Sequence, residues 1–297
     1  MSRAPAPSRM VTRAGRPGDA DAVGRVLHEA FSDVAVRHGY ASDFPSVQYG
    51  VGLARTLLSA PPYRGVVAQR GHEIVGAAFV NVADPIRGIG PVGVLPRAQG
   101  SGAGRALMEA VIEEGSGGAG LRLTQDLFNM TSLSLYASLG FELKEPLALY
   151  QGRPPAPPPG AAPAHVRAMA DHDLAACSAL CRRVHGEPRD AEVAAALRGG
   201  LPAVVAERGE RLVAYTTTLS WWQRGHAVAE SRADLRALLS GAGALAHEPL
   251  TFLVPLRDAE LHQWCLAGGL RTVKPMALMA LGPYLEPRGA WLPSVAY

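Results

Sequence analysis

A proline-rich segment divides this chain and limits how it can fold. Residues 152–164 read GRPPAPPPGAAPA, and six of these thirteen residues are proline. Such a segment prefers the extended polyproline II conformation and forms neither a helix nor a strand ladder. We therefore predict a linker at 152–164 between a domain at 1–151 and a domain at 165–297, each of ordinary domain size.

Composition excludes several classes of protein. Of the 297 residues 48% are hydrophobic, so the chain can bury real cores, and the net charge is only +3 without a clustered basic run. A nucleic-acid-binding surface needs such a cluster, and a membrane span needs about 18–20 consecutive apolar residues, which are absent. We therefore expect neither nucleic-acid nor membrane partners.

The cysteines point to a reducing compartment. Cys177, Cys181 and Cys265 are sparse and odd in number, which argues against a disulfide framework. Cys177 and Cys181 lie one helical turn apart, but no further ligand completes a zinc set. The N-terminus lacks the apolar core of a signal peptide. We expect a cytoplasmic protein without a metal site.

Hydrophobic periodicity predicts an α/β fold with a mixed sheet in the first half. The predicted strands are Met10–Ala14, Gly65–Gln69, Ile74–Val82, Ile89–Leu95, Leu121–Phe128 and Phe141–Tyr150. The first predicted helix begins at Asp19 or Asp21 and ends near Arg37. The other predicted helices cover Val47–Ser59, Gly102–Glu114 and Ser132–Leu139.

A glycine-rich turn joins a predicted strand to a predicted helix. The stretch runs from Val94 to Met108 as VLPRAQGSGAGRALM. Glycines let the backbone approach an anion, and free N–H groups at a helix start bind phosphate. No Lys-Ser/Thr pair follows the glycines, which excludes a P-loop, and the turn comes too late for a Rossmann loop. A turn that merely packs the helix on the strand is the alternative.

Two ordered motifs resemble the GCN5-related N-acetyltransferases, the GNAT superfamily. Gln99-x-x-Gly102-x-Gly104 resembles motif A, although Arg97-x-x-Gly100-x-Gly102 also fits one register earlier. Asn129 followed by Leu135-Tyr136-x-x-x-Gly140-Phe141 resembles motif B. In addition, residues 165–297 repeat the same kinds of element in weaker form. The resemblance implies two tandem GNAT folds, the second degenerate.

The resemblance also implies a cofactor and a role for each motif residue. Acetyl-CoA would be the cosubstrate and Tyr136 the general acid that protonates the departing thiolate, while Asn129 would contact the cofactor arm. The strand that ends at Val94 would splay from its neighbour and pair with the pantetheine. The pyrophosphate would lie on the amides of Gln99, Gly100, Ser101, Gly102, Ala103, Gly104 and Arg105. A mere packing role for Tyr136 is the alternative.

No general base is evident. The strand before motif A contains no carboxylate, whereas many relatives carry a Glu there. Glu29, His38 and Asp126 are candidates, each with an ordinary surface role as the alternative. By analogy with the family, the loop His38–Ser46 would line the acceptor site.

The second half is expected to have lost its cofactor loop. Ser231-Arg232-Ala233-Asp234 reads as a capped helix start, so side chains would satisfy the amides that acetyl-CoA would otherwise use. Trp264 falls near the position of Tyr136. Trp221, Trp222 and Trp264 either line an acceptor pocket or pack in a core.

The apolar tail, residues 282–297, is expected to dock rather than float free. One hypothesis brings the Tyr297 carboxylate to the first active site as the missing base.

The sequence thus predicts an acyltransferase: an N-acetyltransferase that transfers an acetyl group to a small-molecule amine. A non-catalytic acyl-CoA sensor is the alternative function. The second half also leaves open a homodimer.

Overall fold

The computed structural model describes residues 10–156 and 164–295. The chain separates into two compact units, one of residues up to Val82 together with Ile89–Gly117, the other of Ala83–Gly88 together with Gly118 onward. These units do not follow the predicted ranges 1–151 and 165–297. The core of the predicted linker, residues 157–163, lies outside the described residues, as do the N-terminal residues 1–9.

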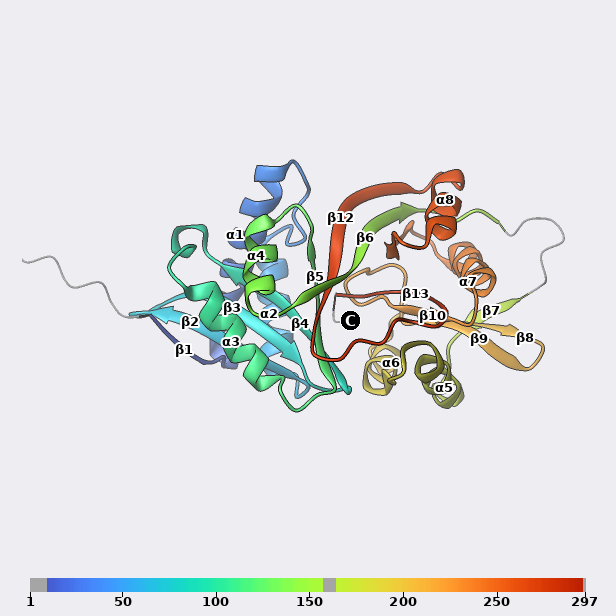
Figure 1. Cartoon of the computed structure of the whole chain (residues 1–297), viewed down its shortest axis with the longest axis horizontal. Helices are drawn as coiled ribbons and strands as arrows, with labels where there is room; N and C mark the ends of the chain where they lie inside the picture. Colours follow the sequence, from blue (N-terminus) through green and yellow to red (C-terminus); the bar gives the residue numbers. More distant parts are fainter. Residues whose placement is uncertain (1–9, 157–163, 296–297) are drawn as a thin grey trace, which may run out of the picture. The chain divides into compact units, whose positions relative to one another are not determined.

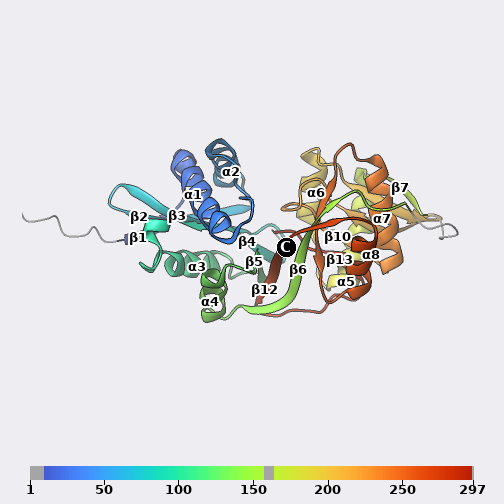
Figure 2. The ribbon, with the colours of Figure 1, turned by 90° about the horizontal axis from the view of Figure 1, so that it is seen from above.

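The first unit is a sheet covered by helices on both faces. β1 (Met10–Ala14), β2 (Tyr63–Arg70), β3 (Glu73–Asn81) and β4 (Ile86–Val94) are neighbours in that order. α1 (Ala20–His38) and α2 (Val47–Ser59) lie on one face, and α3 (Ala103–Glu114) lies on the other (Figure 2). The short turns η1 (Pro17–Asp19) and η2 (Pro96–Ala98) precede α1 and α3.

The second unit contains a five-stranded sheet of its own. Its order is β13 (Ala290–Leu292), β10 (Ala227–Ala229), β9 (Arg211–Thr216), β8 (Val204–Arg208) and β7 (His165–Ala168). Its helices are α5 (Leu174–His185, after η3, Asp171–Asp173), α6 (Asp190–Arg198) and α7 (Arg232–Leu245). Separate cores form where α7 meets the sheet and where α5 and α6 meet it.

In the remaining part of the second unit, the two halves of the chain exchange strands. β5 (Gly120–Asp126), β12 (Arg271–Leu281), β6 (Glu142–Gly152) and β11 (Leu250–Pro255) are neighbours in that order. Figure 1 shows β5, β12 and β6 of this series. The last strand of the second half, β12, therefore pairs with β5 of the first half, and β6 of the first half pairs with β11 of the second. Because the halves exchange strands, no compact division can fall at the proline-rich segment.

The two halves repeat one another closely at both of their ends. α4 (Met130–Ser138) and β6 recur, 129 residues later, as α8 (Ala259–Ala267) and β12. The registers also match, since Leu147 pairs with Pro255 as Met276 pairs with Asp126. At the other end of each half, Arg13 binds Asp19 at 2.7 Å and Arg167 binds Asp173 at 2.8 Å.

These observations confirm the predicted mixed α/β fold and its repeat. Most predicted elements are found within a few residues of their observed bounds. β13 and the strand exchange were not predicted from the sequence. The predicted docking of the tail is found, because β13 pairs antiparallel with β10. The Tyr297 carboxylate lies outside the described residues.

Candidate acetyl-CoA site

The glycine-rich turn needs its glycines for conformation. β4 ends at Val94, and the chain reaches α3 through Gly100 at φ +73° and Gly102 at φ +86°. Residues with a Cβ adopt this left-handed region at a cost of roughly 1–2 kcal/mol. A Cβ added at either glycine would meet no atom within 4 Å. The turn is therefore shaped by glycine while the space in front of it stays open.

The start of α3 presents uncapped amides. Gly102 is the N-cap residue and offers no side chain, and the first intrahelical bond runs from the Ala106 N–H to the Gly102 carbonyl at 3.0 Å. The N–H groups of Gly102, Ala103 and Gly104 therefore have no acceptor within the helix. Together with the helix dipole, they form the kind of site that binds phosphate.

Side chains around the turn brace it. The Gln99 side chain donates to the Val94 carbonyl at 3.2 Å, and Ser101 donates to the Ala98 carbonyl at 2.6 Å. Arg97 pairs with Glu29 at 3.4 Å and also with Glu73. Because Gln99 and Arg97 are both engaged by neighbours, these contacts do not distinguish the motif A register that begins at Gln99 from the one that begins at Arg97.

The second unit holds the motif B helix, α4. Asn129 caps it, with its side-chain oxygen accepting from the Ser132 N–H at 3.3 Å. The Ser132 hydroxyl in turn bonds to the Asn129 carbonyl at 2.9 Å and to the side chain of Gln125 on β5. The start of α4 is thus fixed to the end of β5.

Tyr136 lies on α4 with only 7% of its surface exposed. Its ring packs against Phe141, with the ring centroids 6.2 Å apart. Burial, together with the negative charge of Asp126, raises the pKa of Tyr136 to about 12. The phenol is therefore protonated at neutral pH and can act as an acid but not as a base.

The candidate bases all have partners. The Glu29 carboxylate pairs with Arg97. The exposed His38 ring lies 2.8 Å from the Val34 carbonyl. Asp126 binds the Nζ of Lys274 on β12 at 2.7 Å, a contact that sequence reasoning missed. The side chain of Lys274 is 4% exposed, and its ammonium lies 5.1 Å from the ring centre of Trp222.

The corresponding helix start in the second half is capped. Ser231 accepts a hydrogen bond from the Asp234 N–H at 3.2 Å, and Asp234 binds Arg208 at 2.6 Å. The predicted cap is therefore confirmed. No glycine turn precedes α7, and its Asp234 amide is served by the Ser231 side chain rather than left for an anion.

The residue equivalent to Tyr136 is Cys265, not Trp264 as the sequence suggested. The Phe141 N–H bonds to the Tyr136 carbonyl, and the Leu270 N–H bonds to the Cys265 carbonyl, each at 3.0 Å. Cys265 is a buried free thiol, and burial raises its pKa to about 12. Trp264 packs against the α7 core and Trp222 is buried, which favours the packing role for both.

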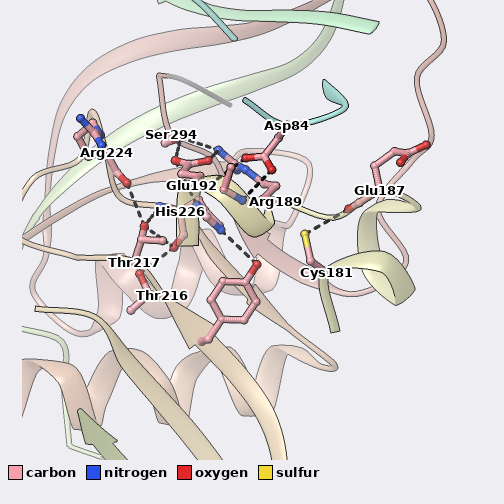
Figure 3. A network of polar contacts seen from close by, with 12 residues as sticks. Asp84, Cys181, Glu187, Arg189, Glu192, Thr216, Thr217, Arg224, His226 and Ser294 are labelled. Carbon is pink, nitrogen blue, oxygen red and sulfur yellow. Dashed lines mark hydrogen bonds and ion pairs between the residues drawn. The ribbon is translucent and has the colours of Figure 1, made fainter. Parts of the chain in front are cut away.

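A buried polar network fastens the start of α6 in the second unit (Figure 3). Asp84 caps the helix, accepting from the N–H groups of Ala191 at 2.9 Å and Glu192 at 3.0 Å. Burial raises the pKa of Asp84 although both bonds favour its charged form. The segment that precedes β4 is thus tied to the second half.

Glu192 is the centre of that network. Its carboxylate contacts Arg189, lies 3.5 Å from Ser294 and 3.5 Å from His226, and all four residues are buried. Burial opposes its charge, but Arg189 and His226 outweigh burial and lower the pKa of Glu192. These contacts connect α6 with His226 and with Ser294 of the tail, so the network acts as a structural tie.

The described residues form neither a metal cluster nor a membrane span. Among residues 10–156 and 164–295, no three His, Cys, Asp or Glu side chains gather as metal ligands would. No helix in those ranges combines the length and apolarity that crossing a bilayer requires.

Comparison with known proteins agrees with the two motifs. Residues 61–143 match the model of the acetyltransferase (GNAT) domain. The match to the GNAT family covers these residues, less than half of the chain. The match includes the glycine-rich turn and the motif B helix. A comparison with curated protein sequences gave no significant match.

Several solved structures resemble this chain over nearly its whole length. A proposed acetyltransferase from Pyrococcus horikoshii is 17% identical, with a TM-score of 0.70 over 95% of this chain and 94% of that one. A GCN5-related N-acetyltransferase from Sphaerobacter thermophilus is 16% identical, with a TM-score of 0.64 over 96% and 99%. A tandem GNAT protein from clavulanic acid biosynthesis is 17% identical, with a TM-score of 0.59 over 93% and 100%. The chain thus has the fold of two tandem GNAT domains.

Proposed function

We propose that this protein is an N-acetyltransferase that moves the acetyl group of acetyl-CoA to the amine of a small molecule. The uncapped start of α3, behind Gly100 and Gly102, is the observation that carries the proposal. It offers amides and a helix dipole to a pyrophosphate, and the match of residues 61–143 to the GNAT family supplies the corresponding chemistry.

The proposed reaction is a direct attack. The amine nitrogen of the acceptor adds to the thioester carbonyl carbon, and the carbon–sulfur bond then breaks. The departing thiolate takes a proton from the Tyr136 hydroxyl, while the attacking nitrogen gives up its proton to a base or to water. No covalent enzyme intermediate forms. The Tyr136 phenol carries its proton at neutral pH and so has one to donate, although its raised pKa makes it a weaker acid than an ordinary tyrosine.

The proposal assigns each predicted site residue a contact with the cofactor. The amides of Gly102, Ala103 and Gly104 would take the pyrophosphate, and those of Gln99, Gly100, Ser101 and Arg105 would complete the turn around it. Val94, at the end of β4, would pair with the pantetheine. Since the Asn129 side-chain oxygen caps α4, its Nδ2 group would be the donor toward the cofactor arm.

The test is a panel of small amines with acetyl-CoA, read as release of free CoA thiol. Tyr136→Phe should lower the rate about 10²–10⁴-fold, the usual contribution of a general acid. Tyr150→Phe is the matched control, since Tyr150 is also a buried tyrosine whose pKa is raised to about 12, by burial. Equal rates for wild type and Tyr136→Phe would assign Tyr136 to packing.

An acyl-CoA sensor is the second candidate function. One observation favours it: β4 lacks a carboxylate, and Glu29 and Asp126 are both bound to cations. A sensor would bind acetyl-CoA in calorimetry yet release no thiol with any amine. The proposed dimer is a separate question, which light scattering of the full chain answers. The cytoplasmic location stays a prediction.

A further inference from the structure

The strand exchange brings a charged residue of the second half to the start of the motif B helix. Lys274 lies on β12, at the irregularity in its pairing with β6. Its buried ammonium binds Asp126 at 2.7 Å, and the neighbouring Pro275 carbonyl accepts from the Leu127 N–H at 3.2 Å. β12 thus binds the turn between β5 and α4 through a backbone hydrogen bond and an ion pair.

From that turn, a short series of bonds leads to α4. The Asp126 carbonyl accepts from the Asn129 N–H at 3.0 Å, and the Asn129 side chain caps α4 at the Ser132 N–H. Tyr136 lies on this helix, one turn beyond the capped residues. Asp126 also acts on Tyr136 directly, since its charge contributes to the raised pKa of that phenol. Whatever holds Asp126 therefore sets both the position of α4 and the field around Tyr136.

The equivalent turn in the second half is held differently. The Pro146 carbonyl accepts from the Leu256 N–H at 2.9 Å, which repeats the bond between Pro275 and Leu127. The ion pair is reversed, because here the strand supplies Glu145 and the turn supplies Arg257, at 2.6 Å. Only the turn that leads to Tyr136 receives a cation from the exchanged strand. The pseudo-symmetry therefore supplies a matched internal control.

We propose that Lys274 is a positioning residue for Tyr136, contributed by the otherwise degenerate second half. This inference rests on the proposed function, in which Tyr136 is the acid. A buried ion pair loses most when one partner is removed, because the other charge is then left without compensation. Without Lys274, the Asp126 carboxylate would lie uncompensated beside Tyr136, and the start of α4 would lose a support.

The experiment compares Lys274→Met with Arg257→Met. We expect Lys274→Met to lower kcat about 10- to 100-fold, with the KM for acetyl-CoA changed less than about threefold, and Arg257→Met to stay within about twofold of wild type. Lys274→Arg should restore much of the loss, because it keeps the charge. In a Tyr136→Phe background, Lys274→Met should cost less than about threefold more.

Hydrogen exchange gives a readout that does not depend on turnover. Lys274→Met should speed exchange of the α4 amides relative to those of α8, and Arg257→Met should do the reverse. If Lys274→Met fails to fold, Asp126→Asn takes its place in the same comparison of hydrogen exchange between α4 and α8. This variant removes the carboxylate charge of the ion pair and keeps the shape of the side chain.

Three results would overturn the proposal. They are equal losses of kcat in Lys274→Met and Arg257→Met, an undiminished effect of Lys274→Met in the Tyr136→Phe background, and unchanged α4 exchange. Failure of the proposed function would look different: wild type would release no thiol with any amine, while the exchange result would still decide whether Lys274 supports α4.

Discussion

The starts of α3 and α7 are equivalent points of the two halves with opposite chemistry. α3 begins behind Gly100 and Gly102, with an N-cap residue that has no side chain. α7 begins at Ser231, whose hydroxyl serves the Asp234 amide, and Asp234 is itself held by Arg208. The same fold can therefore keep or lose an anion site through a few residues, because the amides at a helix start go either to a ligand or to a side chain.

The motif B helices show the same contrast. Their backbone bonds are alike, yet α4 carries Tyr136 where α8 carries Cys265. Both side chains are buried and protonated at neutral pH, since burial leads the rise in each pKa to about 12. The second half has thus kept the scaffold and lost the groups that we assign to chemistry.

The largest effect should come from filling the glycine turn. Gly102→Val places a β-branched residue at φ +86° and sets its side chain in front of the open amides. We expect the Kd for acetyl-CoA to rise at least about 100-fold, or about 2.7 kcal/mol, measured by calorimetry.

Gly209→Val is the control for backbone strain. Gly209 lies in the β8–β9 turn at φ +61°, also with nothing near its missing Cβ. This variant should lose stability but keep its affinity for acetyl-CoA. If both variants bind acetyl-CoA as wild type does, α3 is not the pyrophosphate site.

A smaller effect should separate α1 from α5. Phe31 on α1 packs against Phe44, whereas the equivalent residue of α5 is His185, buried against Trp291. Burial, helped by Arg189, lowers the pKa of His185 to about 3. Below about pH 6.5, His185 therefore binds a proton in the unfolded chain but stays neutral in the folded chain.

This linkage has a definite sign. The contribution of His185 to stability is complete above about pH 6.5 and declines on acidification, by up to about 1.4 kcal/mol per pH unit. His185→Phe copies the first half and should remove about 2 kcal/mol of the loss between pH 6.5 and pH 5, in urea unfolding. Glu192 and His226, with pKa values also lowered, should leave a remaining slope. The exposed His72→Phe is the control, and an equal change in both variants would contradict the assignment.

The smallest effect should come from the cap of α7. Ser231→Ala should lower the free energy of unfolding by about 1 kcal/mol, the usual value of an N-cap. Ser46→Ala, at the cap of α2, should do the same, because Ser46 accepts from the Tyr49 N–H at 3.1 Å. Neither should change acetyl-CoA binding. If Ser231→Ala instead increases the affinity for acetyl-CoA, then the Ser231 cap alone prevents the second half from binding acetyl-CoA.

Local patterns made much of this molecule predictable. Gly102 and Ser231 indicate how their helices begin, because a helix start depends on a few neighbouring residues. The alternation and periodicity of apolar side chains gave the strands and helices within a few residues. The spacing of the motif placed Trp264 near the position of Tyr136, one residue from the true equivalent, Cys265. That equivalence rests on a backbone hydrogen bond to Cys265, which no sequence pattern displays.

The sequence by itself determined the repeat, the open helix start at Gly102 and the closed one at Ser231. Tertiary structure alone decided which strands pair, because β12 bonds to β5 rather than remaining in its own half. Strand pairing depends on packing between residues distant in the sequence, and similar strands such as β6 and β12 have similar local patterns. For that reason the contact between Lys274 and Asp126 emerges only when the chain is folded.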